Sequence, residues 1–171
     1  MDAFTALVER HGPQLYRLAY RLTGNEQDAR DAVQEGLLRA YRGFDAFEGR
    51  SDAGTWLYRI VLNCSIDMHR AAGTGPNKPA AAPLATLQGL PAARASPERL
   101  AASAETQRHI EAALEQLTPL ERAAFTLRHF EGQATDDIGR LLGIRGNAAR
   151  QHVFRAVRKL RAALAFQRSG Q

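Results

Sequence analysis

Apolar residues recur every three to four positions along most of this chain, a period typical of helices that bury one face. The strict alternation of apolar and polar residues that marks a half-buried strand is absent. Near the N-terminus one stripe contains Phe4, Leu7 and Val8, and a second contains Leu15, Leu18, Ala19 and Leu22. Gly12-Pro13 lies between the two stripes, and because proline disrupts a helix interior, we expect the helix to be interrupted there.

Two further helices are predicted before residue 72. Asn25 followed by Asp28 is a helix-start signal, since a short polar side chain can cap the first turn. The stripe after it contains Ala29, Ala32, Val33, Gly36, Leu37, Ala40 and Tyr41. Residues 43–52 form a predicted loop, and Ser51 or Asp52 is expected to cap the third helix. The buried stripe expected there contains Ala53, Trp56, Leu57, Ile60, Val61, Cys64 and Met68.

The segment 71–97 breaks the helical period. It is rich in Pro, Gly and Ala and has no apolar stripe, a composition typical of a tether between domains. We therefore predict an all-α protein of two small helical domains, at 1–72 and 98–166, joined by a flexible linker at 73–97.

The second domain has the pattern of a helix-turn-helix. Thr118-Pro119-Leu120-Glu121 is a capping box with proline in the first turn, and that helix is expected to end at Gly132. A short helix is predicted at 135–142 and a long one at 147–166. Small Gly139, the turn residue Gly143 and apolar Ile144 suit two helices that cross closely. A purely structural helical hairpin gives a similar pattern.

Charge is distributed unevenly along the chain, whose formal net charge is +5. No Asp or Glu follows Asp137, whereas the basic residues after it are Arg140, Arg145, Arg150, Arg155, Arg158, Lys159, Arg161 and Arg168. A stretch of one charge sign indicates a polyanionic partner, and the alternative is a basic helix that only faces water.

One side of the last helix combines cations, an amide and an aromatic ring. These residues are Arg150, Gln151, Phe154, Arg155 and Arg158. They lie away from the expected core stripe of Ala149, Val153, Val157, Leu160 and Leu164. Because Arg pairs with guanine and Gln with adenine in the major groove, this side predicts binding to duplex DNA. Phe154 allows two interpretations, contact with a thymine methyl or sugar and packing against the preceding helix.

The composition argues against several functional classes. The single cysteine excludes a disulfide framework and a Cys-rich zinc site. His11, His69, His109, His129 and His152 show no metal-ligand spacing. No catalytic motif is present, no apolar run reaches the roughly 18 residues of a membrane span, and the first residues lack a signal segment. We therefore expect a cytoplasmic protein that is not an enzyme and needs no metal or cofactor.

The second predicted helix has an acidic side. Asp28, Asp31 and Glu35 lie at i, i+3 and i+7, opposite the apolar stripe, and Gln34 stands beside them. We expect this face to have no apolar neighbours. A solvated surface is the plain interpretation, and a docking surface for a basic partner is the other.

Several segments resemble bacterial RNA polymerase sigma factors. Residues 28–36, Asp-Ala-Arg-Asp-Ala-Val-Gln-Glu-Gly, resemble region 2.2 of these proteins. Residues 55–63, Thr-Trp-Leu-Tyr-Arg-Ile-Val-Leu-Asn, resemble regions 2.3 and 2.4, and residues 132–144 with the basic helix after them resemble region 4. Their order and spacing are those of the two-domain extracytoplasmic function (ECF) type, and the resemblance covers nearly the whole chain except the linker.

The resemblance implies an alternative, signal-responsive sigma factor that recruits core RNA polymerase to promoters and initiates transcription. It implies docking on the polymerase β′ coiled coil by Asp28, Asp31, Gln34 and Glu35. It implies −10 strand capture by Phe44, Phe47, Ser51, Arg59 and Asn63. It implies −35 recognition by Arg145, Asn147, Arg150, Gln151, Phe154, Arg155 and Arg158. The implied partners are core polymerase, including its β flap, promoter DNA and an anti-sigma factor.

Two points qualify the resemblance. Ala134 and Arg145 stand where the family commonly has serine, which leaves Thr135 as the expected cap of the short helix. The alternative function is a stand-alone helix-turn-helix regulator of the response-regulator output type, which leaves the acidic helix face and the aromatic loop without a role.

Overall fold

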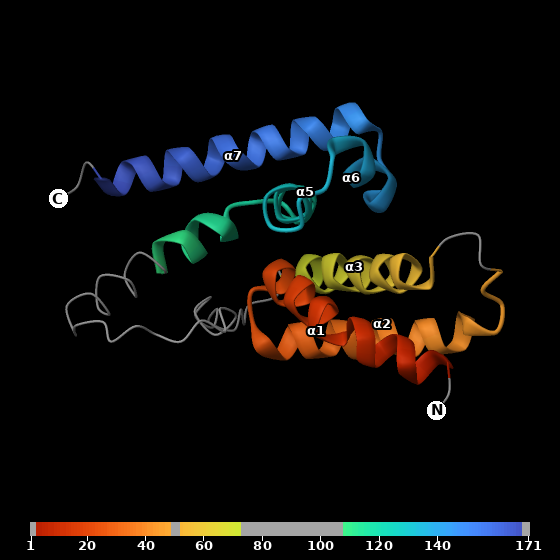
Figure 1. Cartoon of the computed structure of the whole chain (residues 1–171). Coiled ribbons are helices and arrows are strands. Elements are labelled where there is room, and N and C mark those ends of the chain that lie inside the picture. The colour runs from red at the N-terminus through yellow and green to blue at the C-terminus, as the bar shows by residue number, and fades with distance from the viewer. Residues whose placement is uncertain (1–2, 49–51, 73–107, 169–171) are drawn as a thin grey trace, which may run out of the picture. The chain divides into compact units, whose positions relative to one another are not determined.

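The computed structural model describes residues 3–48, 52–72 and 108–168, and within these ranges all regular secondary structure is helical (Figure 1). This confirms the predicted all-α class. The chain divides into two compact units, Met1–Ala80 and Ala81–Gln171. The predicted linker at 73–97 lies outside the described residues.

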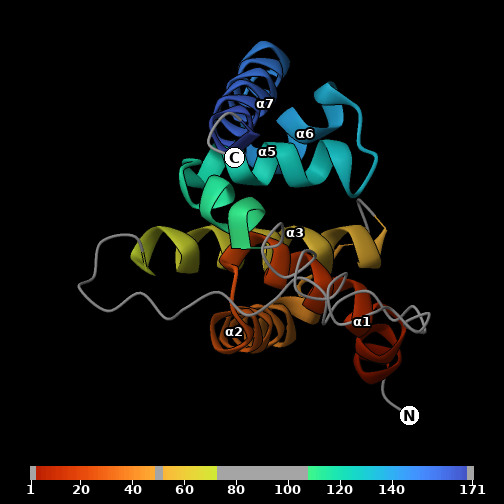
Figure 2. The ribbon, with the colours of Figure 1, turned by 90° about the vertical axis from the view of Figure 1, so that its left-hand side faces the viewer.

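The first unit is a three-helix assembly of α1 (Ala3–Thr23), α2 (Glu26–Phe44) and α3 (Ala53–Ala72), in which each helix packs against the other two. Figure 2 shows α2 nearly end-on, with α3 above it. Large apolar side chains from α1 and α3 fill the core: Leu15, Leu18, Leu22, Leu57, Val61 and Leu62 are at most 1% exposed.

Helix α2 contributes small residues to this core. Its buried residues are Ala29, Ala32, Gly36 and Ala40. A β-carbon at Gly36 would lie 2.7 Å from Cγ2 of Val61 and 3.1 Å from its Cα. Because no side chain fits at that distance, glycine at position 36 lets α2 and α3 approach closely.

The expected interruption at Gly12-Pro13 is wrong, because α1 runs unbroken from Ala3 to Thr23 with Pro13 inside it. Pro13 has no N–H, so the helix lacks one backbone hydrogen bond at this point. Phe4 before the proline and Leu15 and Leu18 after it are all buried. Burial of both ends of α1 on the other two helices offsets the cost of the proline.

The apolar stripes of α2 and α3 are wider than the faces that become buried. Tyr41, expected in the core, is 63% exposed, and Val33 and Leu37 are only half-buried. Trp56, Ile60 and Met68 on α3 are half-buried too. The physical reason is that only the small residues of α2 lie close enough to its neighbours to be covered.

The second unit contains a helical segment at 108–115 followed by α5 (Pro119–His129), α6 (Thr135–Leu142) and α7 (Gly146–Arg168). The predicted capping box of α5 is present, with Thr118 Oγ1 accepting from the Glu121 N–H at 3.2 Å. Helices α5 and α6 both pack against α7. Gly143 has a φ of 68°, so the turn between α6 and α7 uses the left-handed conformation that glycine adopts without strain.

Two local expectations for this unit are wrong. Ala134, not Thr135, is the N-cap of α6, and it provides no side-chain hydrogen bond. Leu164 is 37% exposed, whereas Ala156, absent from the predicted stripe, is fully buried beside Leu114 and Leu117. The core of this unit is therefore built around the middle of α7.

Candidate polymerase and nucleic-acid interfaces

An acidic ridge, which we define as Asp31, Gln34 and Glu35, follows the surface of α2. Its charges are partly paired within the helix: Gln27 Nε2 donates to both Asp31 carboxylate oxygens at 3.0 and 3.2 Å, and Arg39 Nε lies 2.6 Å from Glu35 Oε1. These pairs are solvent-exposed and stabilise the fold by at most about 1 kcal/mol each. The ridge therefore remains available for an external basic partner.

Asp28 has a different environment from the ridge. Its backbone N–H donates to Asn25 Oδ1 at 2.8 Å, and its carboxylate accepts from Asn25 Nδ2 at 2.7 Å. Asn25 is the N-cap of α2, as the sequence predicted. Asp28 thus helps to hold the start of the helix, half-buried, besides lying near the ridge.

The expectation that this face has no apolar neighbours is wrong. A surface groove of about 440 Å³, the α2 groove, borders Gln34. It is lined by Phe4, Tyr16, Arg30, Val33, Gln34, Leu37, Leu38 and Tyr41. Leu38 is 45% exposed and Tyr41 63% exposed, so large apolar groups face solvent directly beside the ridge.

An aromatic cluster, Phe44, Phe47 and Trp56, lies where α2 ends and α3 begins. The ring centroids of Phe47 and Trp56 are 4.9 Å apart, and those of Phe44 and Trp56 are 6.3 Å apart. All three side chains are half-buried, so their ring faces are partly accessible. Asp52 caps α3 by accepting from the Thr55 N–H at 3.1 Å, whereas Ser51 lies outside the described residues.

Arg59 and Asn63 lie one turn apart on α3, and both are exposed. This confirms their predicted position on the polar face of the helix. Because Arg59 follows Trp56 by three residues, the two share neighbouring positions on the helix surface. The exposed side of α3 thus continues from the aromatic cluster towards two polar groups that can bond bases or phosphates.

The residues predicted to contact the −35 element lie on α7, except Arg145, which directly precedes this helix. All of them are exposed: Arg145, Asn147, Arg150, Gln151, Phe154, Arg155 and Arg158. Phe154 is 66% exposed, which excludes the interpretation that it packs in the core. We call Arg150, Gln151, Phe154, Arg155 and Arg158 the recognition face.

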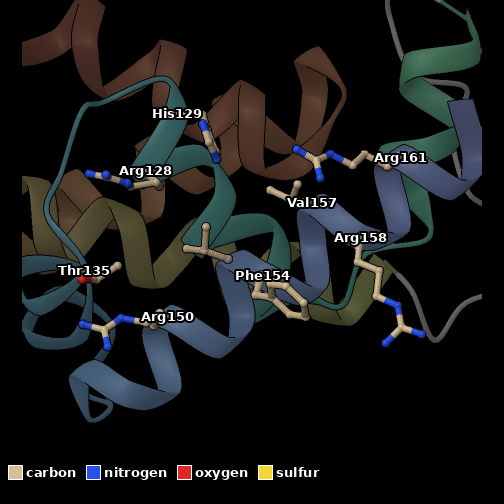
Figure 3. A pocket seen from close by; sticks show the side chains of 9 residues that line it. Arg128, His129, Thr135, Arg150, Phe154, Val157, Arg158 and Arg161 are labelled. Atoms are coloured by element: carbon tan, nitrogen blue, oxygen red, sulfur yellow. The ribbon is translucent and has the colours of Figure 1, made fainter.

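A surface hollow of about 640 Å³, the α7 hollow, adjoins the recognition face (Figure 3). Its lining consists of Arg128, His129, Thr135, Arg150, Val153, Phe154, Val157, Arg158 and Arg161. Sequence reasoning missed Arg128 and His129, which come from the end of α5. Arg161 had a usable signal, since it follows Arg150 by three helical turns on the same helix.

The described residues contain no group of three or more His, Cys, Asp or Glu arranged to hold a metal ion. Among the helices described, none is long and apolar enough to cross a membrane.

Comparison with known proteins identifies the family. Residues 7–74 match the family model Sigma-70 region 2, and residues 107–160 match Sigma-70, region 4. The chain is 34% identical over 165 residues to the ECF RNA polymerase sigma factor SigE of Mycolicibacterium smegmatis. It is 30% identical over 169 residues to the ECF RNA polymerase sigma factor SigW of Bacillus subtilis. The chain belongs to the ECF sigma factors.

The extent of these matches differs between relatives. The SigE alignment covers 96% of this chain and 63% of SigE. The SigW alignment covers 95% of this chain and 89% of SigW. The fold resembles the sigma factor RpoE of Bartonella quintana, which was solved in complex with the anti-sigma factor NepR. The TM-score is 0.65 and the identity is 22%, and the match covers 96% of this chain and 98% of RpoE. It also resembles CnrH, in complex with the cytosolic domain of CnrY, with a TM-score of 0.64 at 25% identity over 95% and 88%.

As an ECF sigma factor, the protein is a transcription initiation factor. The match of residues 7–74 to region 2 disfavours the alternative of a stand-alone regulator, because that class shares only the terminal helix-turn-helix.

In this sigma factor α7 is held on α5 by a partly buried ion pair between Lys159 and Glu121. Glu121 is 4% exposed, and its carboxylate accepts from Lys159 Nζ at 2.7 Å and from the Thr118 N–H at 3.0 Å. Burial alone would raise the pKa of Glu121, but the hydrogen bonds from Lys159 and Thr118 and the charge of Lys159 hold the pKa below its ordinary value. The pair therefore fixes the start of α5 against the middle of α7.

Lys159→Met should lower the stability of the second unit by about 1–3 kcal/mol at pH 7, because it leaves a buried carboxylate without its cation. Since folding depresses the pKa of Glu121, the stabilisation exists above the ordinary carboxyl pKa of about 4.3 and is lost as the pH falls through the lower folded value. Urea unfolding at pH 7 and pH 3 measures the difference, which should shrink at pH 3. Arg161→Met on the exposed side is the control. A pH-independent difference would contradict the assignment.

Proposed function

We propose that this sigma factor recruits core RNA polymerase to promoters and divides initiation among three surfaces. The acidic ridge docks on the polymerase, the aromatic cluster captures the opened −10 strand, and the recognition face binds the −35 duplex. On this proposal residues 1–72 form the docking and −10 domain and residues 98–166 form the −35 domain. The observation on which it chiefly rests is the recognition face, an exposed row of cations, amide and aromatic ring on a helix-turn-helix.

Docking is proposed to combine charge with apolar contact. The ridge supplies Asp31 and Glu35, and the α2 groove beside it supplies Leu38 and Tyr41. The partner in this family, a basic-rimmed coiled coil of the β′ subunit, offers the complementary charge. Electrostatic complementarity speeds encounter and fixes orientation, whereas the apolar groove contributes burial energy.

Strand capture requires an accessible aromatic surface, because extracting a base from the duplex costs a few kcal/mol that stacking and hydrogen bonding must offset. Phe47 and Trp56 provide partly accessible rings, and Arg59 and Asn63 provide polar groups further along α3. Ser51 is part of this proposal from the sequence alone.

Recognition of the −35 element is assigned to the start of α7. Arg150 and Gln151 can contact base edges, and Arg155 and Arg158 can contact bases or phosphates. Exposed Phe154 can contact a thymine methyl or a sugar face. Arg145 and Asn147 precede these residues and extend the same exposed surface.

Regulation by an anti-sigma factor is proposed from the similar sigma factors RpoE and CnrH, which were solved with NepR and with the cytosolic domain of CnrY.

The proposed function includes contact of the second domain with the polymerase β flap. It also includes a cytoplasmic location, where bacterial RNA polymerase works, and an alternative, signal-responsive role without catalysis.

The docking proposal predicts that Asp31→Lys with Glu35→Lys lowers affinity for core polymerase by at least about tenfold, equal to about 1.4 kcal/mol. The melting temperature should change little, because both side chains form only exposed contacts within the helix. Glu9→Lys with Asp67→Lys makes the same charge change at exposed positions on α1 and α3 and is the control. Equal affinity of parent and ridge variant would refute docking at this surface.

The recognition face predicts that Arg150→Ala and Arg155→Ala each weaken binding to a selected promoter duplex by about 1–3 kcal/mol. Each arginine is exposed, so folding should be unaffected. Fluorescence anisotropy with selected and scrambled duplexes separates lost base contacts from lost phosphate contacts. Arg140→Ala, whose guanidinium lies 2.9 Å from Asp137, removes one charge from the same unit as a control. If both variants bind like the parent, this face is not the −35 surface.

The capture proposal predicts that Phe47→Ala leaves core binding and −35 duplex binding unchanged but impairs promoter opening. Phe47 is half-buried against Trp56, and its loss removes one of the two rings in contact. Permanganate reactivity of unpaired thymines in complexes with the reconstituted holoenzyme measures opening directly. A footprint identical to that of the parent would show that Phe47 only fills space.

A further inference from the structure

Five aromatic rings form a continuous row across the three helices of the first unit. Phe4 on α1 lies edge-to-face with Tyr41 at 5.4 Å and with Phe44 at 5.3 Å between ring centroids. Phe44 contacts Trp56 at 6.3 Å, and Trp56 contacts Phe47 at 4.9 Å. We call these residues the aromatic row.

The two ends of the row reach two different surfaces. Tyr41, 63% exposed, lines the α2 groove beside the acidic ridge. Phe47 lies in the loop assigned to strand capture. Phe4 lies between Tyr41 and Phe44 in the row, and at 9% exposed it contributes only a small area to the α2 groove. Figure 1 shows the start of α1 at the same end of the unit as the end of α2 and the start of α3.

Phe44 needs support from outside its own helix. It is the last residue of α2, where helices fray. The loop after it has one described backbone hydrogen bond of its own, from the Phe47 N–H to the Phe44 carbonyl at 3.1 Å. An edge-to-face contact stabilises a ring pair beyond its burial and restricts its orientation. Phe4 thus holds Phe44 in place, and Phe44 contacts the indole on which Phe47 packs.

We propose that Phe4 is a positioning residue for strand capture, which acts through Phe44 and Trp56 to hold Phe47 in the orientation that receives the −10 strand. The inference rests on the proposed function of the aromatic cluster. It assigns a role in promoter opening to α1, which that function otherwise uses only to line the α2 groove. A captured base needs rings held in advance, because ordering them during capture would lower the affinity for the strand.

The test uses full-length variants assembled with core polymerase on a promoter duplex selected by the parent holoenzyme. Phe4→Leu keeps an apolar side chain but removes the ring, and Phe4→Tyr keeps the ring. At saturating core polymerase, Phe4→Leu should lower permanganate reactivity of the −10 thymines by about threefold, the effect of one aromatic pair, with unchanged affinity for −35 duplex. Core affinity is measured separately, because Phe4 also lines the α2 groove and contacts Tyr41. Phe4→Tyr should retain opening.

Leu22→Ala is the matched control. Leu22 is 1% exposed at the other end of α1, so its truncation destabilises the same unit away from the row. The comparison requires that Leu22→Ala and Phe4→Leu have similar melting temperatures. If Leu22→Ala then reduces opening as much as Phe4→Leu, the loss comes from lower stability of the unit and the inference is overturned. If the loss of opening in Phe4→Leu disappears at saturating core polymerase, Phe4 acts through the polymerase contact at the α2 groove and the inference is overturned too.

Phe47→Ala, measured alongside, separates this inference from the function beneath it. If Phe47→Ala impairs opening while Phe4→Leu does not, only the role of Phe4 is wrong. If Phe47→Ala opens the promoter like the parent, the capture assignment fails and the role of Phe4 fails with it.

Discussion

The first unit depends on the close approach of α2 to its neighbours. That approach requires small residues, because Ala29, Ala32 and Ala40 are fully buried and a β-carbon at Gly36 would overlap Val61. A helix that packs with small residues leaves its larger apolar and charged side chains on the outside. The acidic ridge and the α2 groove are therefore products of the same packing that makes the unit compact.

The second unit holds the strongly basic helix α7 in place without neutralising its exposed cations. Its core contacts come from small and apolar residues near the middle of α7, such as Ala156. The buried anion Glu121 engages Lys159, which follows Arg155 by one turn and is not a member of the recognition face. The cations of that face stay exposed, so the unit is stabilised without using the charges that the proposed contact with DNA phosphate needs.

Opposite charge on the two proposed binding surfaces also separates their partners. The acidic ridge disfavours nucleic acid and favours a basic protein surface, whereas the recognition face has the reverse preference. The third proposed surface, the aromatic cluster, relies on accessible ring faces rather than on charge. On this proposal the three surfaces differ in charge or in chemical type, so a change in one need not weaken the others.

Local chemistry in the sequence was sufficient for the helical class, the cap at Asn25, the capping box at Thr118 and Glu121, and the exposed position of Arg150. These features depend on residues a few positions apart on one helix, and helical period alone brings such residues together. The resemblance to sigma factors came from the same short segments, and it indicated the family before any packing was known.

Only the tertiary structure decided which side of each stripe is covered. It made α1 continuous through Pro13, left Tyr41 exposed, and brought Arg128 of α5 and Arg150 of α7 to the same hollow. It also joined Phe4 to Phe44 across two helices. Periodicity states which residues share a face, but burial depends on how closely another helix approaches that face. That distance is set by side chains far apart in the sequence, which no local pattern records.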